Sequence, residues 1–183
     1  MKIIDPEVIH DIYDGVIEGK NVQTYKKPFN EVKNLYKDIS NIKEDAKMYT
    51  VYSYEKGNPK QKGNLMWGLT ILEPVYINDE CNMTRGHFHE DKDCVEFYFG
   101  IQGEGLLVLM DEHGETWAEK VYKGSLHYID GKIAHRLVNV GDESLKVGAC
   151  WPNTAGHDYA SIEKKEFSYR IFRKNKKLVF EKR

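Results

Sequence analysis

Residues 86–103 read Gly-His-Phe-His-Glu-Asp-Lys-Asp-Cys-Val-Glu-Phe-Tyr-Phe-Gly-Ile-Gln-Gly, and this stretch decides the fold. It has the pattern His-x-His-x6-Glu-x6-Gly, in which His87, His89 and Glu96 are the polar fixed points. Side chains two residues apart on a strand point to the same face, so both imidazoles are expected side by side. The aromatic and apolar residues around Glu96 predict a strand over residues 95–101.

A second block, further along the chain, supplies a fourth candidate ligand. Gly124, His135 and Asn139 form the pattern Gly-x10-His-x3-Asn. A lone His-x-His pair arises by chance in a chain with seven histidines, but two spaced blocks in a β-rich context favour a metal site. The predicted ligands are His87, His89, Glu96 and His135. Three imidazoles and one carboxylate suit one divalent transition metal, namely Fe(II), Mn(II), Ni(II), Co(II) or Zn(II), whereas Ca or Mg prefers more oxygens.

Short strand-forming segments separated by turn-forming residues follow one another from residue 47 onward. They recur about every ten residues with no helices between them, which is typical of an antiparallel sandwich or jelly roll. Strands are expected over residues 48–54, 66–72, 95–101, 105–111, 116–121, 125–129, 135–140, 145–151, 168–172 and 177–180.

A single domain over residues 1–183 is predicted, because this length suffices for one core and no repeat or linker divides the chain. Its expected parts are an irregular N-terminal arm (1–46), a barrel core (47–172) and a C-terminal tail (173–183). Within the arm, apolar residues at helical spacing predict a helix over residues 30–38. A short helical turn is expected over residues 161–166.

Composition limits the classes of partner and compartment. The net charge of −2 gives no general electrostatic reason to expect nucleic acid or an anionic membrane as partner. Asp5 and Glu7 interrupt the apolar start, and no run approaches the roughly 20 apolar residues of a membrane span. Three cysteines without CxxC spacing argue against a disulfide framework. We therefore expect a cytoplasmic protein with reduced thiols.

The two histidine blocks resemble the two motifs of the cupin superfamily. The second block departs from the usual form, because Asp130 and Lys132 stand where a proline and a glycine are common. The resemblance implies an all-β fold, a cupin jelly-roll β-barrel with an N-terminal arm and a few short helices. Cupins include dioxygenases, decarboxylases, epimerases, isomerases and storage proteins, so this resemblance alone leaves the function open.

Three longer stretches are similar to the cupin-type phosphoglucose isomerases. They are Thr-Arg-Gly-His-Phe-His at 84–89, Val-Glu-Phe-Tyr at 95–98 with Gly-Glu-Gly at 103–105, and Trp-Pro-Asn-Thr-Ala-Gly-His-Asp-Tyr at 151–159. The last stretch discriminates best, because most other cupins lack its Ala-Gly-His-Asp-Tyr segment. The resemblance implies a metal-dependent homodimer, with Fe(II) the favoured ion, that interconverts glucose 6-phosphate and fructose 6-phosphate in glycolysis and gluconeogenesis.

The resemblance also implies which residues bind the substrate. The family's phosphate-contacting positions match Thr70, Thr84, Gly86 and Tyr98. Arg85 is placed to add a charge there. His157 and Tyr159 match residues at the sugar end of the pocket, where they would assist ring opening, although a turn capped by Asp158 is the plainer interpretation. Trp151 stands where the family often has a tyrosine, so it keeps an aromatic wall and loses a hydroxyl.

The implied chemistry moves a hydrogen between C1 and C2 of the sugar. A metal ion would bind the oxygens on these carbons, and Glu96 matches the family's candidate base that carries the proton. A metal-assisted hydride shift is the rival route. Two other functions stay open at this point: an Fe(II) cupin dioxygenase with the same four ligands, and a non-catalytic sugar-phosphate-binding cupin.

Overall fold

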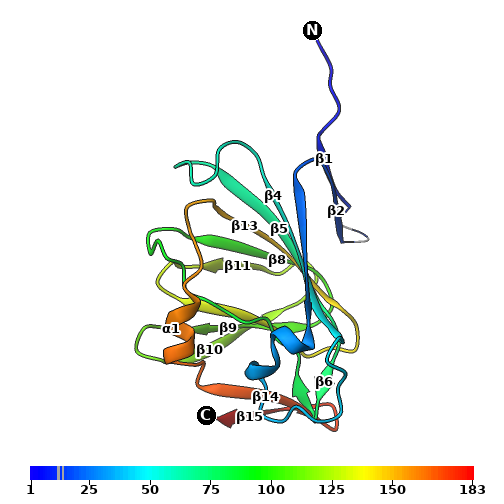
Figure 1. Cartoon of the computed structure of the whole chain (residues 1–183), viewed down its shortest axis with the longest axis vertical. Helices are drawn as coiled ribbons and strands as arrows, with labels where there is room; N and C mark the ends of the chain where they lie inside the picture. The colour runs from blue at the N-terminus through cyan, green and yellow to red at the C-terminus, as the bar shows by residue number, and fades with distance from the viewer. Residues whose placement is uncertain (12, 14) are drawn as a thin grey trace.

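Two β-sheets face each other in the structure, a computed structural model that describes residues 1–11, 13 and 15–183. Figure 1 shows β4, β5, β13, β8 and β11 in one layer, β9 and β10 in the other, and β14 and β15 at one end. The strands are β1 (Val8–Asp11), β2 (Val16–Gly19), β3 (Val22–Pro28), β4 (Lys47–Glu55), β5 (Leu65–Leu72), β6 (Tyr76–Ile77), β7 (Glu80–Cys81), β8 (Glu96–Gln102), β9 (Gly105–Met110), β10 (Thr116–Val121), β11 (Leu126–Ile129), β12 (Ala134–Asn139), β13 (Leu145–Pro152), β14 (Tyr169–Lys174) and β15 (Lys177–Lys182). The described helices are α1 (Tyr159–Lys164) and the 3-10 turns η1 (Phe29–Glu31) and η2 (Lys33–Leu35).

The larger sheet has the strand order β11-β8-β13-β5-β4-β3, and the smaller has the order β10-β9-β12. Their facing side chains share one core, which includes Met48, Leu72, Leu107 and Leu137, each at most 1% exposed. Every strand predicted from the sequence forms, with bounds within two residues of those expected. The cupin-type β-sandwich that the sequence predicted is confirmed.

The N-terminal region differs from the irregular arm that the sequence predicted over residues 1–46. Within it, β3 pairs with β4 as the outermost strand of the larger sheet, and β1 pairs with β2. Four of the seven residues of β3 are exposed, so this edge strand lacks the apolar alternation that would mark it in the sequence. In the C-terminal tail (173–183), the strand predicted over residues 177–180 forms as β15 and pairs with β14 along its length.

The helix predicted over residues 30–38 is wrong, because η1 and η2 occupy most of that range. Phe29, Val32 and Leu35 are buried and lie three residues apart. A 3-10 helix has three residues per turn, so side chains three residues apart lie on the same face. An α-helix would align these three side chains less exactly. No helix among the described residues is long and apolar enough to cross a membrane.

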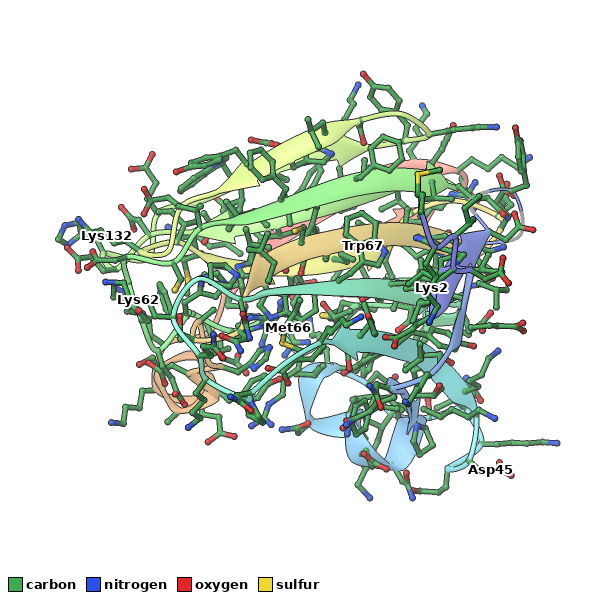
Figure 2. All side chains as sticks on the ribbon, turned by 90° about the horizontal axis from the view of Figure 1, so that it is seen from above. Lys2, Asp45, Lys62, Met66, Trp67 and Lys132 are labelled. Atoms are coloured by element: carbon green, nitrogen blue, oxygen red, sulfur yellow. The ribbon has the colours of Figure 1, made fainter. Side chains whose placement is uncertain are left out.

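The N-terminal ribbon, formed by β1 and β2, packs against the larger sheet (Figure 2, where Trp67 is labelled). Ile17 is only 2% exposed and packs with Leu69 and Ile101 in a second apolar cluster. The indole Nε1 of Trp67 donates a hydrogen bond of 2.9 Å to Nδ1 of His10. His10 Nε2 is buried and has no hydrogen-bond partner in the described structure, so the ring is held in an environment that suits its neutral form.

Acidification should weaken the packing of this ribbon. Burial lowers the pKa of His10 below its usual 6.5, against an opposing effect of Asp11. The unfolded chain therefore binds a proton more readily than the folded one, and stability is lost as pH falls through the unfolded pKa. We expect the free energy of unfolding, measured in denaturant, to fall between pH 7.5 and pH 5.5 by less in His10→Gln than in the wild type. An equal fall in both proteins would show that His10 does not contribute.

Candidate metal centre

Four side chains converge in the interior of the sandwich. His87, His89, Glu96 and His135 each present one ligand atom, and these atoms all lie within 4.8 Å of one another. Glu96 Oε2 lies 3.3 Å from His89 Nε2 and 3.1 Å from His135 Nε2. Despite this short distance, the buried His135 Nε2 forms no hydrogen bond with any residue that the structure describes. A buried, unpaired imidazole nitrogen next to a carboxylate fits a position where a metal ion would supply the missing partner.

Backbone pairing places two of the imidazoles beside each other. The His135 N–H donates to the His87 carbonyl at 3.0 Å, and the His87 N–H donates to the His135 carbonyl at 3.2 Å. Directly opposed residues have neighbouring side chains, and the two ring centroids are 4.5 Å apart. An antiparallel bridge between the loop that carries His87 and strand β12 thus brings the two histidine blocks of the sequence together.

The other two ligands are oriented by local contacts. His89 Nδ1 donates to the Cys94 carbonyl at 2.8 Å, which leaves the lone pair of Nε2 for a metal. Glu96 begins β8, where it faces inward with Tyr98, while Phe97 between them is 44% exposed. This alternation is the period-two geometry of a strand with one buried face.

The pKa values of the cluster are shifted by burial and by the contacts among its members. For His89, burial lowers the pKa, but the contacts with Glu96 and the Cys94 carbonyl outweigh burial and raise it above its usual value. Burial lowers the pKa of His87 well below its usual value, so its ring is neutral at pH 7. Burial raises the pKa of Glu96, but the interactions with His135 and His89 outweigh burial and hold that pKa below its usual value. Metal ligands must be deprotonated carboxylates and neutral imidazoles, so an ion bound here would compete with a proton on His89.

A glycine is required at the entrance to the first histidine block. Gly86 has φ of +76°, in the left-handed region. A Cβ there would lie 2.8 Å from Cε2 of Phe167 and 3.0 Å from the His135 carbonyl. Both the backbone conformation and the space therefore exclude a side chain at this position, and the backbone can pass close to β12.

Side chains of β12 and of the loop hold residues 84–87 in place. The Leu137 N–H donates to Thr84 Oγ1 at 3.0 Å. Arg136 Nη2 donates to the Arg85 carbonyl at 3.0 Å, and its guanidinium lies 4.1 Å from the centroid of the Phe167 ring. Burial lowers the pKa of Arg136 to about 9. The loop that carries His87 is thus fixed by backbone and side-chain bonds on both sides of Gly86.

The ligand cluster borders a cavity of about 140 Å³ between the sheets. One water needs only about 10–15 Å³ of such volume, so the cavity has room for a ligand of several heavy atoms. The predicted site residues that line it are Thr70, Thr84, Arg85, Gly86, His87, Glu96, Tyr98, His135, Trp151, His157 and Tyr159. The remaining predicted residue, His89, lies behind the wall and is 1% exposed. The structure therefore brings all the predicted site residues to one place.

His157 and Tyr159 lie at the mouth of this cavity, where their rings stack at 5.7 Å between centroids and 7° between planes. The His157 ring is 4.4 Å from that of His87. Between them, Asp158 caps α1 by accepting from the Ser161 N–H at 3.0 Å, so the capped turn and the cavity position coexist. Loss of hydration lowers the pKa of His157 and burial raises that of Tyr159, so at pH 7 the imidazole is neutral and the phenol protonated.

Sequence reasoning missed several residues of the cavity wall. Tyr49 and Val51, both on β4, line it together with Leu69 and Ala149. Burial raises the pKa of Tyr49 to about 12, so its hydroxyl is a donor. Tyr49 and Val51 are two residues apart on β4, so the sequence does indicate that they share a face. Tyrosine and valine are, however, too common in strands to indicate a site.

Comparison with known proteins identifies relatives over nearly the whole chain. A family model described as glucose-6-phosphate isomerase matches residues 20–182. Glucose-6-phosphate isomerase of Pyrococcus abyssi is 36% identical, with coverage of 90% of this chain and 88% of the relative. The proteins of that name from Thermococcus kodakarensis and Sinorhizobium medicae are 35% and 33% identical, over 86% and 89% of this chain and 84% and 78% of the relatives. The family match spans every residue of the metal cluster and the cavity wall.

Proposed function

The chain belongs to the glucose-6-phosphate isomerase family, and from this premise we propose that it interconverts glucose 6-phosphate and fructose 6-phosphate. The observation that carries the proposal is the single cavity that joins a metal-ligand cluster to hydroxyl-bearing side chains. An aldose–ketose isomerisation needs help at the carbonyl, a proton carrier and an anchor for the phosphate. The residues below supply each of these. The reaction would serve glycolysis and gluconeogenesis.

The donor set fits one divalent transition metal, and we propose Fe(II) as the favoured ion, with Mn(II), Ni(II), Co(II) and Zn(II) as substitutes. His87, His89, His135 and Glu96 would hold it, and the unpaired Nε2 of His135 supports this assignment. Such an ion would polarise the sugar oxygens on C1 and C2 and offset the charge of an enediolate.

Glu96 is proposed as the proton carrier as well as a ligand. Its depressed pKa keeps the carboxylate ionised at neutral pH, and it lies 5% exposed beside the cavity. The carboxylate would remove the proton from C2 of the aldose and return it to C1 to give the ketose. A hydride shift from C2 to C1 needs no such carrier, so the two routes make different predictions for this residue.

Neutral groups around the cavity are proposed to bind the two ends of the substrate. The Thr84 hydroxyl accepts from a backbone N–H, so its own proton is free to donate to the phosphate. Thr70, Tyr98 and the Gly86 N–H would add donors. At the other end, neutral His157 and protonated Tyr159 can exchange protons with the ring oxygen and the C1 hydroxyl in ring opening. The Trp151 indole would form the wall beside the sugar.

We also propose that the enzyme is a cytoplasmic homodimer. Its three cysteines are free, which suits a reducing compartment. On the outer face of the larger sheet, β8 and β11 expose four apolar side chains, and the rings of Phe97 and Tyr128 contact each other at 5.5 Å. The four are Phe97, Phe99, Leu126 and Tyr128, between 38% and 65% exposed. Such a patch supports an isologous contact between two copies.

Turnover of fructose 6-phosphate tests the proposed function directly. We expect the protein loaded with Fe(II) or Mn(II) to form glucose 6-phosphate, detected by coupled reduction of NADP, and to consume no oxygen. Oxygen uptake by the iron-loaded protein would indicate the dioxygenase alternative. Binding of fructose 6-phosphate in calorimetry without turnover under any metal would indicate the non-catalytic alternative.

A further inference from the structure

The metal ion proposed above would bind the sugar oxygens, so the charge on the substrate's phosphate is left to be offset by side chains of the cavity wall. A phosphate monoester carries a charge of about −1.5 to −2 at pH 7. Among the described residues that line the cavity, Arg85 is the only lysine or arginine. The hydroxyls and backbone N–H groups proposed above are neutral, and an ionised group enclosed by neutral donors alone is costly to desolvate. Arg85 is therefore the one wall residue that can offset the charge of the phosphate.

The Arg85 side chain is engaged with α1 at the mouth of the cavity. Its Nη2 lies 2.5 Å from Oε1 of Glu163, and its guanidinium carbon lies 4.2 Å from the centroid of the Tyr159 ring. Tyr159 and Glu163 are four residues apart, so they project from the same face of the helix. The backbone of Arg85 is separately fixed by Arg136. The guanidinium lies beside Tyr159, at the end of the cavity proposed for the sugar, so it would turn toward Thr84, its neighbour in sequence, to meet the phosphate. This turn needs only rotation of the side chain and leaves the loop that carries the metal ligand in place.

A phosphate can readily replace Glu163 as the partner of Arg85. The two side chains of this ion pair are 41% and 61% exposed, and exposed ion pairs contribute little to stability. A phosphate offers more charge than a carboxylate and accepts two parallel bonds from a guanidinium, which makes the Arg–phosphate pair the stronger one. Glu163 competes for the cation but does not hold it irreversibly.

We infer that Arg85 is the cation that positions the substrate's phosphate, and that Glu163 sets the strength of this interaction by competing for Arg85. The inference rests on the proposed function, since it assigns a phosphate to this cavity. It gives α1 a role in specificity: the helix presents both the Tyr159 ring and the competing carboxylate to Arg85. A phosphate displaces Glu163, whereas an uncharged sugar leaves the pair in place.

A double-mutant cycle on the metal-loaded full chain tests the inference. We expect Arg85→Gln to raise KM for fructose 6-phosphate about tenfold or more, with kcat within about twofold, because binding is lost uniformly. Inhibition by inorganic phosphate should weaken in parallel. Arg85→Lys should recover part of the affinity for fructose 6-phosphate and for inorganic phosphate. Glu163→Gln should lower KM about two- to fivefold, because it removes an exposed carboxylate that competes for Arg85. In the Arg85→Gln background, Glu163→Gln should have no further effect.

Two results would overturn the inference. One is an unchanged KM and an unchanged phosphate inhibition constant in Arg85→Gln. The other is an equal effect of Glu163→Gln with and without Arg85, which would mean a general charge effect. The matched control is Glu112→Gln, which removes the same charge from an exposed side chain outside the cavity and should leave KM unchanged. If the wild type shows no turnover, the proposed function fails, and calorimetric binding of inorganic phosphate to the same variants still tests Arg85.

Discussion

Glu96→Gln should abolish isomerisation while the protein still binds a sugar phosphate. The amide has nearly the shape of the carboxylate but cannot accept the proton from C2, and loss of a general base costs about 10²- to 10⁴-fold in kcat. Its oxygen would still face the proposed metal, and the proposed phosphate-binding groups at Thr84 and Tyr98 are unchanged. Steady-state kinetics on fructose 6-phosphate, with binding measured by calorimetry, should therefore show a fall in kcat with the affinity for the sugar largely preserved.

Metal content and isotope exchange distinguish proton transfer by Glu96 from a hydride shift. The variant must carry the same metal per chain as the wild type, since Glu96 is also a proposed ligand. In heavy water the wild type should incorporate deuterium at C1 and C2, and the variant should not. Glu115→Gln, which neutralises an exposed carboxylate on the hairpin between β9 and β10, should behave as the wild type does. Persisting turnover in Glu96→Gln with a full metal load would favour a hydride shift.

The metal ligands could be predicted because their signal is local. His87 and His89 stand two residues apart, and Glu96 lies in an apolar run that specifies a strand. The strand that this run predicted is observed, and within it Phe97 points outward between Glu96 and Tyr98. His135 is different: only the second motif and the family resemblance joined it to the others, and the bridge to His87 is the long-range contact that realises the prediction.

The parts that sequence could not predict depend on distant neighbours. β3 carries little apolar alternation, and it is a strand because β4 offers it an unpaired edge. Tyr49 is an ordinary strand residue until its place in the wall of the cavity is known. Glu163 follows Arg85 by 78 positions, and no pattern in the chain relates the two. In each case the relevant information is a tertiary contact rather than a spacing.

Removal of the metal should lower thermal stability as well as activity. Without an ion, the cluster leaves a buried carboxylate among three imidazoles, and His135 Nε2 has no hydrogen bond to the part of the chain that the structure describes. A ligand that binds only the folded state at a thousandfold its Kd stabilises it by about 4 kcal/mol. For a chain of this size each kcal/mol shifts Tm by about 2–4 °C, so chelation should lower Tm by roughly 8–16 °C. Calorimetry of chelated and Fe(II)- or Mn(II)-reloaded protein measures the difference.

Two histidine variants assign this stabilisation to the cluster. His135→Gln removes a buried ligand, so both the gain in Tm on adding metal and the turnover should be largely lost. His113→Gln removes a histidine whose side chain is 83% exposed, and it should retain both. A full metal-induced shift in His135→Gln would place the ion elsewhere. Because Tm is measured without substrate, this result reports on metal binding and not on the chemistry proposed for Glu96. If His135→Gln loses the metal-induced gain in Tm and Glu96→Gln retains it, metal binding depends on His135 and proton transfer on Glu96.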